Sequence, residues 1–135
     1  MTNLQGSWVA MPTPFTENNK IDFQGFEILI NRQIQYGTSQ LFILGSAGEV
    51  TLLGLGEKQA IVKEVISMTK GKIPVFFSAA SFTTEMSVEF AQYCEKQGAD
   101  GVIFTIPPYV LINQHAAHTH LDTCMSAVDI PCGIY

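Results

Sequence analysis

A repeat that alternates strand and helix constrains this chain more than any other feature. Residues 37–43 (Gly-Thr-Ser-Gln-Leu-Phe-Ile) are similar to residues 98–104 (Gly-Ala-Asp-Gly-Val-Ile-Phe), which follow 61 positions later. Likewise, residues 73–75 (Ile-Pro-Val) recur 57 positions later as residues 130–132 (Ile-Pro-Cys). Each repeat therefore contains two strand–helix units. Successive parallel strands with helical crossovers place the chain in the α/β class.

The individual elements are expected from periodicity and from Gly and Pro punctuation. Short apolar runs predict strands, and apolar residues three and four positions apart predict helices. Asp22 and Thr83 are candidate N-caps, because their side chains can accept hydrogen bonds from the first helical turn. A loop bracketed by Gly54 and Gly56 is expected before the second helix. Strands are predicted at residues 8–12, 41–44, 75–80, 101–106 and 132–135, and helices between Asp22 and Gly37 and at residues 57–69, 83–96 and 113–127.

Two architectures fit this order, a doubly wound sheet and a barrel, and periodicity alone does not separate them. The whole chain, residues 1–135, fits one domain. Four strand–helix units plus a fifth strand cannot close an eight-stranded barrel, which usually has roughly 200 residues or more. A half-barrel would leave its first and fifth strands as open edges, so it should pair with itself or with a complementary half. A complete doubly wound domain needs no such partner.

Charge and hydropathy exclude several classes of partner. The net charge is −5, from seven Lys plus Arg against twelve Asp plus Glu, and no basic cluster suggests nucleic acid or an anionic membrane surface. No apolar run approaches the roughly 18 residues of a membrane helix, and no signal peptide is evident. Cys94, Cys124 and Cys132 lack metal-ligand spacing and are expected to be reduced thiols. We therefore expect a cytoplasmic protein.

Functional loops in either architecture lie at the carboxyl ends of the strands. Residues 45–49, Gly-Ser-Ala-Gly-Glu, follow the second strand. Small residues between two glycines let backbone N–H groups converge on an anion, with the Ser46 hydroxyl beside it. The alternative is a tight strand-to-helix turn without a ligand. The Glu49 carboxylate is expected to accept hydrogen bonds from neighbouring backbone N–H groups rather than to act as an acid or base.

Two tyrosines and three histidines are further candidates. Tyr109 and Tyr135 end the fourth and fifth strands, where a phenol can transfer protons, although buried tyrosines more often only pack. His115, His118 and His120 have no carboxylate or cysteine at ligand spacing, so a solvated helix face is preferred over a metal site. No metal and no cofactor are expected.

Residues 45–49 resemble the Gly-Thr/Ser-Thr-Gly-Glu signature of the dihydrodipicolinate synthase and N-acetylneuraminate lyase family. Four further segments are similar to family motifs and occur in the same order: residues 12–15, 98–101, 107–109 and 130–135. One short motif is weak evidence, whereas five in register over nearly the whole chain are specific. The resemblance favours the barrel and implies the N-terminal half of a (β/α)8 TIM barrel.

The resemblance also implies a chemistry, in which a lysine forms a Schiff base with pyruvate and a carbon–carbon bond is made or cleaved at the pyruvate methyl. Ser46 matches the hydroxyl of the family's proton relay, and Tyr135 the tyrosine that relays protons and orients the substrate. Tyr109 matches a tyrosine that reaches across a tight dimer interface. Ser46, Ala47 and Gly48 match the segment that holds the pyruvate carboxylate. The implied ligand is pyruvate or a related small keto acid.

Three departures from the family pattern qualify this expectation. Ala47 replaces a hydroxyl residue, and the apolar residues 110–112 replace a polar stretch, so a relative acting on another keto acid is favoured. The family's lysine would follow on the sixth strand, beyond Tyr135. The lysines present are all expected in turns, on helices or before strands: Lys20, Lys58, Lys63, Lys70, Lys72 and Lys96.

Three functions therefore remain open. The leading expectation is a truncated pyruvate-dependent lyase that is inactive as this chain alone. The second is a non-enzymatic half-barrel that self-associates and binds a small carboxylate or a full-length relative. The third, least favoured, is a complete small enzyme with different chemistry, because no base–nucleophile pair or metal cluster is evident.

Overall fold

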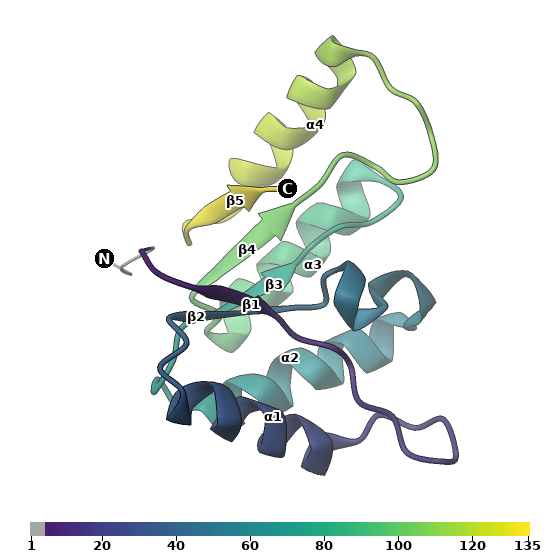
Figure 1. Cartoon of the computed structure of the whole chain (residues 1–135). Coiled ribbons are helices and arrows are strands. Elements are labelled where there is room, and N and C mark those ends of the chain that lie inside the picture. Colours follow the sequence, from purple (N-terminus) through teal and green to yellow (C-terminus); the bar gives the residue numbers. More distant parts are fainter. Residues whose placement is uncertain (1–4) are drawn as a thin grey trace.

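The computed structural model describes residues 5–135, which form one five-stranded parallel sheet in the order β1-β2-β3-β4-β5 (Figure 1). The strands are β1 (Trp8–Ala10), β2 (Gln40–Ile43), β3 (Val75–Ser78), β4 (Gly101–Phe104) and β5 (Cys132–Ile134). The helices are α1 (Phe23–Gln35), α2 (Leu55–Thr69), α3 (Thr84–Gln97) and α4 (Gln114–Met125), with short 3₁₀ turns η1 (Ser46–Gly48) and η2 (Val50–Leu52). The predicted α/β class and the alternation of elements are confirmed.

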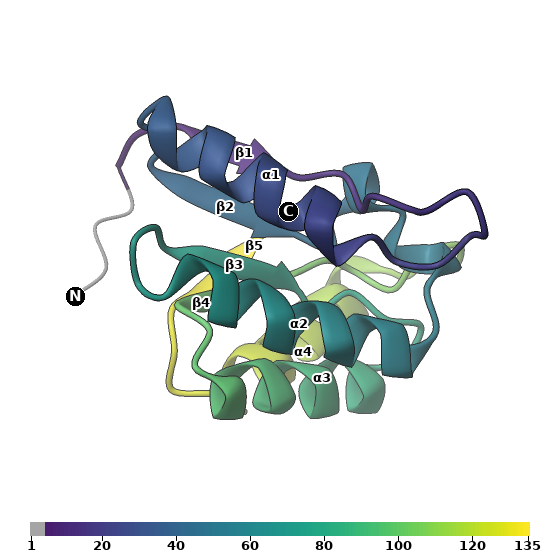
Figure 2. The same cartoon turned by 90° about the horizontal axis from the view of Figure 1, so that it is seen from below.

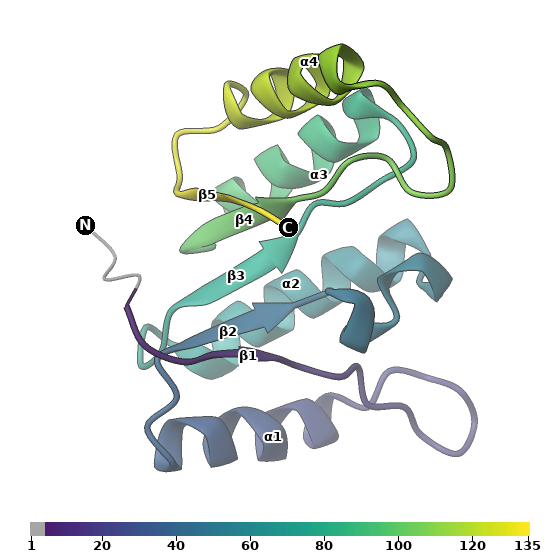
Figure 3. The same ribbon diagram turned by 45° about the horizontal axis from the view of Figure 1, so that its top comes forward.

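The order of the strands decides between the two architectures. Each strand pairs with its neighbour in sequence, so each new strand is added on the same side of the one before it. The four helices consequently cover one face of a curved sheet, as Figures 2 and 3 show from two directions. A doubly wound sheet would carry helices on both faces. This arrangement is that of a partial barrel, with the helices outside.

Local hydrogen bonds explain where the helices begin. The Asp22 carboxylate accepts from the Gly25 N–H at 3.0 Å, and the Thr83 hydroxyl accepts from the Met86 N–H at 3.2 Å, so both predicted N-caps are confirmed. Helix α2 begins at Leu55, earlier than predicted, because the Glu57 carboxylate accepts from the Gly54 N–H at 2.8 Å. Gly56 therefore lies in the first turn of a helix and not in a loop.

The core fills the space between the sheet and its helices. Side chains alternate along each strand, so every second residue faces the helices. Leu41, Ile43 and Phe77 are buried there against Phe26 of α1 and Ile61 of α2. Strands β3 and β4 end two residues before their predicted ends, at Ser78 and Phe104. The chain leaves the sheet at these points and enters the loops that carry the candidate site.

The opposite, concave face of the sheet carries aromatic side chains. Trp8 and Phe76 lie with ring centroids 4.6 Å apart, and the rings of Phe42 and Tyr135 lie 6.5 Å apart. Phe76 is buried, whereas Trp8 on edge strand β1 is 37% exposed. Among residues 5–135, both edge strands, β1 and β5, pair on one side only. No helix within residues 5–135 has the length and hydropathy of a membrane span.

Candidate functional site at the carboxyl ends of the strands

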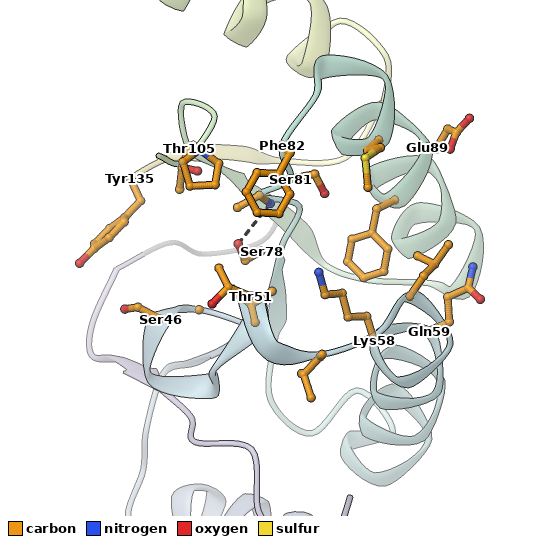
Figure 4. A pocket seen from close by; sticks show the side chains of 18 of the residues that line it. Ser46, Thr51, Lys58, Gln59, Ser78, Ser81, Phe82, Glu89, Thr105 and Tyr135 are labelled. Carbon is orange, nitrogen blue, oxygen red and sulfur yellow. Dashed lines mark hydrogen bonds between the residues drawn. The ribbon is translucent and has the colours of Figure 1, made fainter. Parts of the chain in front are cut away.

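A cavity of about 580 Å³ opens at the carboxyl ends of the strands (Figure 4). Its inner wall comes from residues that end or follow β2, β3, β4 and β5, including Ser46, Ser78, Thr105 and Tyr135. Its outer wall comes from η2, the first turns of α2 and the facing side of α3. The lining is mainly apolar, with hydroxyl groups gathered at the strand ends. Such a concave, apolar space with a few convergent polar groups is typical of a small-molecule site.

The loop after β2 turns sharply because of its own backbone hydrogen bonds. Residues 46–48 form the 3₁₀ turn η1, in which the Gly48 N–H donates to the Gly45 carbonyl at 3.0 Å. The Thr13 hydroxyl, itself buried, donates to the Gly48 carbonyl at 2.7 Å and fixes the loop against the end of β1. Within residues 5–135, the N–H groups of Ser46 and Ala47 have no acceptor. These two N–H groups are therefore available as donors to a ligand.

Ser46 and Tyr135 are brought together by the fold. Both side chains line the cavity, although they come from opposite parts of the chain (Figure 4). Tyr135 is 82% exposed, and its backbone N–H donates to the Phe104 carbonyl at 3.0 Å, which continues the ladder of β4 and β5. The parallel register therefore places the phenol at the mouth of the cavity. The catalytic role assigned to these two residues stays a prediction.

Tyr109 does not join this group. Its side chain is fully exposed, and its neighbour Pro108 lines the cavity in its place. The backbone of Tyr109 has a φ of +75°, in the left-handed region that is uncommon for a residue with a side chain. The phenol therefore projects from the loop after β4 into solvent.

Glu49 and His120 differ from their sequence-based expectations. Glu49 is exposed, with a φ of +56°, and its carboxylate accepts no hydrogen bond from any residue of 5–135, so the role of holding nearby N–H groups was wrong. His115 and His118 are solvent-exposed, as predicted, whereas His120 is buried. Its Nδ1 lies 2.8 Å from the Thr84 hydroxyl.

The second ring nitrogen of His120 identifies its tautomer. Nε2 lies 3.1 Å from the Thr105 carbonyl oxygen, which can only accept, so Nε2 carries the proton and Nδ1 accepts from Thr84. His120 thereby ties α4 to α3 and to the end of β4. The three cysteines are free, and in the described part of the chain no group of three or more His, Cys, Asp or Glu is arranged to hold a metal ion.

Lys58 is the site residue that sequence reasoning missed. It lies in the first turn of α2, on a helix as expected for it, but its side chain lines the cavity, which the sequence analysis did not foresee. Partial burial lowers the pKa of its ammonium group from the ordinary value. The signal was present in the sequence, because Leu55, Lys58, Val62 and Val65 share one helical stripe and Lys58 interrupts its apolar character.

Comparison with known proteins identifies the family. The model of the dihydrodipicolinate synthetase family matches residues 3–135. The chain belongs to this family. It is 37% identical over 134 residues to the 4-hydroxy-tetrahydrodipicolinate synthase of Bradyrhizobium diazoefficiens, covering 99% of this chain and 45% of that protein. The chain therefore spans somewhat less than half the length of this curated relative.

Solved structures of the family have the same fold. The crystal structure of dihydrodipicolinate synthase from Aquifex aeolicus superposes with a TM-score of 0.94 at 30% identity, covering 98% of this chain and 45% of that one. YagE, a prophage protein of the dihydrodipicolinic acid synthase family from E. coli K12 solved in complex with pyruvate, gives a TM-score of 0.94 at 27% identity, covering 98% and 44%. The partial-barrel architecture expected from the sequence is confirmed.

Proposed function

We propose that this chain supplies the N-terminal half of the active site of a pyruvate-dependent carbon–carbon lyase. The observation that carries the proposal is the meeting of Ser46 and Tyr135 at one cavity at the carboxyl ends of the strands. Family membership supports it, as does the pyruvate complex of YagE, a relative with the same fold. A cytoplasmic location is part of the proposal, because free thiols are typical of a reducing compartment.

The geometry of the inner wall suggests how pyruvate, or a related small keto acid, is held. Its carboxylate would accept hydrogen bonds from the free N–H groups of Ser46 and Ala47. Ala47 carries no hydroxyl, so at this position the loop can donate only a backbone N–H. The Ser46 side chain is the one hydroxyl group that residues 45–49 provide. Gly48 contributes by letting the chain pass close to β1, since a Cβ atom there would lie 3.2 Å from the Met11 carbonyl oxygen.

Proton transfer is the role proposed for the two hydroxyl groups. A hydroxyl can both donate and accept, so Ser46 and Tyr135 can pass a proton between the keto-acid carbonyl and bulk water. The Tyr135 phenol forms no hydrogen bond with any residue of 5–135 and is free to do so. The Schiff-base amine is proposed to come from the complementary half of the barrel. Tyr109, exposed on its loop, is proposed to act in a neighbouring copy.

A fusion with the missing strands tests this proposal. The C-terminal half of the Bradyrhizobium relative would be joined after Tyr135, and pyruvate would be trapped with borohydride and read by intact mass and by turnover. We expect one pyruvate adduct per fusion, and a loss of turnover on the order of a hundredfold in Ser46→Ala and Tyr135→Phe. Ser126→Ala, on an exposed residue at the end of α4, is the matched control. Full turnover in both site variants would refute the assigned roles.

The same trapping reaction on the 135-residue protein tests the origin of the amine. We expect no pyruvate adduct. Lys58 is the one lysine of residues 5–135 that lines the cavity, and its lowered pKa makes it the place where an adduct would be sought by peptide mapping. A stoichiometric adduct on Lys58 would show that this half of the barrel carries its own Schiff-base lysine.

A second function, self-association without catalysis, is favoured by the apolar edges of the sheet. Ile134 on edge strand β5 faces the helix-covered side of the sheet, yet it is 60% exposed. On the other edge, strand β1 carries the partly exposed Trp8. Such edges are usually paired or covered. Sedimentation of the 135-residue protein distinguishes the outcomes: dimers or larger species support association through this face, and a well-behaved monomer contradicts it.

A further inference from the structure

Helix α4 supports the wall of the cavity without being part of it. Within residues 5–135, none of the residues that line the cavity comes from α4. The ring of His120 on this helix is only 5% exposed, and it reaches the end of β4 and the first turn of α3 through its two hydrogen bonds. The helix therefore contacts the elements of the site through a buried polar side chain.

The loop between β4 and α4, residues 105–113, is hydrogen-bonded at its two ends. Among residues 5–135, residues 107–112 make no hydrogen bond. At the far end, the Asn113 side chain caps α4 by accepting from a backbone N–H of its first turn at 2.9 Å. At the near end, the Thr105 carbonyl accepts from Nε2 of His120 at 3.1 Å. Both ends are therefore fixed to the same helix.

We propose that His120 is a positioning residue that fixes the start of this loop. Thr105 and Pro108 of the loop line the cavity, and Tyr109 projects from it into solvent. The place of all three depends on where the loop leaves β4, because residues 107–112 have no hydrogen bond of their own to hold them. His120 thereby positions one wall of the cavity and the exposed phenol together.

A second hydrogen bond holds the ring of His120 in the state that this role requires. The Thr84 hydroxyl, in the first turn of α3, donates to Nδ1 at 2.8 Å, so the proton lies on Nε2 and points at Thr105. The Cys124 thiol, one turn further along α4, lies 3.9 Å from Nε2. A phenylalanine ring would fill the same space but make neither hydrogen bond.

The anchoring of the loop stands without the proposed lyase function, whereas its effect on turnover rests on that function. Two measurements keep them apart. Proteolysis of the 135-residue protein tests the anchoring alone. Turnover of the fusion that carries the missing strands tests the consequence for the active site.

Cleavage by chymotrypsin measures how firmly the loop is held. Tyr109 and Leu111 are fully exposed, and chymotrypsin cuts after both residue types. The protease needs several residues of extended chain, so one end of the loop must first be released. We expect the initial rate of cleavage at these positions, read by intact mass, to rise about tenfold in His120→Phe, as the loss of one hydrogen bond provides. His120→Gln, whose amide can donate to the Thr105 carbonyl, should stay within about twofold of the unmodified protein.

Two control variants separate anchoring from a general loss of stability. Thr13→Val removes a buried hydrogen bond elsewhere, so it should lower stability without changing the cleavage after Tyr109 or Leu111. His118→Phe places the same ring on the exposed side of α4 and should also leave this cleavage unchanged. Unchanged cleavage in His120→Phe would overturn the proposal, as would an equal acceleration in Thr13→Val.

The kinetics of the fusion show whether the anchored loop matters for catalysis. The keto acid is assigned to the loop after β2, which His120 does not contact, so the KM for pyruvate should change by less than about twofold in His120→Phe. The kcat should fall at least about tenfold, because Tyr109 loses its place. Faster cleavage with an unchanged kcat would retain the anchoring and refute the role of Tyr109 in turnover. A higher KM with an unchanged kcat would overturn the positioning role in catalysis.

Discussion

Gly101 on β4 is the position where adding a single methyl group should most disturb the concave face. A Cβ atom there would lie 2.1 Å from Cε1 and 2.5 Å from Cδ1 of Phe76, and 2.6 Å from the Pro131 carbonyl oxygen. Phe76 is buried under Trp8 and cannot swing away, and the Pro131 carbonyl accepts from the Val102 N–H at 3.0 Å. The methyl group must therefore displace both a packed ring and the backbone that enters β5.

The expected cost follows from these contacts. Overpacking of a well-packed core destabilises by roughly 1–3 kcal/mol, and here the clash includes a backbone atom that cannot change its rotamer. We expect Gly101→Ala to lose about 3 kcal/mol of unfolding free energy. With a urea m-value of about 2 kcal/mol/M, the unfolding midpoint would fall by about 1.5 M. Trp8, the only tryptophan, lies 4.6 Å from Phe76, so its fluorescence reports unfolding at the affected place.

Gly133 on the adjacent strand β5 is a matched control. Its added Cβ would meet Ile103 at 3.4 Å, an ordinary van der Waals contact, and its φ is not in the left-handed region. Gly133→Ala should be neutral or more stable by up to about 1 kcal/mol, because alanine restricts the unfolded chain. The two variants should thus differ by at least about 3 kcal/mol. If they unfold within about 1 kcal/mol of each other, the packing of Phe76 against Gly101 is refuted.

Three other substitutions test two hydrogen bonds near the site and one buried thiol of the core. Thr13→Val should destabilise by about 1–3 kcal/mol in urea unfolding, because it leaves the buried Gly48 carbonyl without its donor; Thr13→Ser, which keeps the hydroxyl, should lose less. His120→Phe should lower the free energy of unfolding by a similar amount, measured by thermal unfolding, because both ring hydrogen bonds are lost. His118→Phe, on the exposed face of the same helix, should change the free energy of unfolding little. Burial raises the pKa of the Cys94 thiol from 9.0 to about 12. The unfolded chain therefore loses this proton first as pH rises, and stability should fall between pH 9 and pH 12 by up to about 1.4 kcal/mol per pH unit. Cys94→Ala should lack this part of the pH dependence, and an unchanged slope would contradict it.

The local features of this protein were readable from its sequence. The order of strands and helices, the N-caps Asp22 and Thr83 and the loop at residues 45–49 depend on residues a few positions apart, so periodicity and capping chemistry predict them. The family motifs lie in the same loops. They predicted the partial barrel, although periodicity alone left a doubly wound sheet open. The ends of the strands were less well predicted, because a strand ends where its neighbour no longer provides hydrogen bonds.

Only the tertiary structure decided which side chains line the same cavity and which are buried. The parallel register carries Ser46 and Tyr135 to one cavity, and the packing of α2 against α3 turns Lys58 into it while leaving Tyr109 outside. His120 is buried where Thr84 of α3 and Thr105, just after β4, provide its two hydrogen-bond partners, and the sequence of its own helix could not reveal them. Burial and convergence depend on contacts between distant segments. A local pattern can mark a single position, as Lys58 is marked on the apolar stripe of its helix, but the register of the sheet decides which distant side chains meet it.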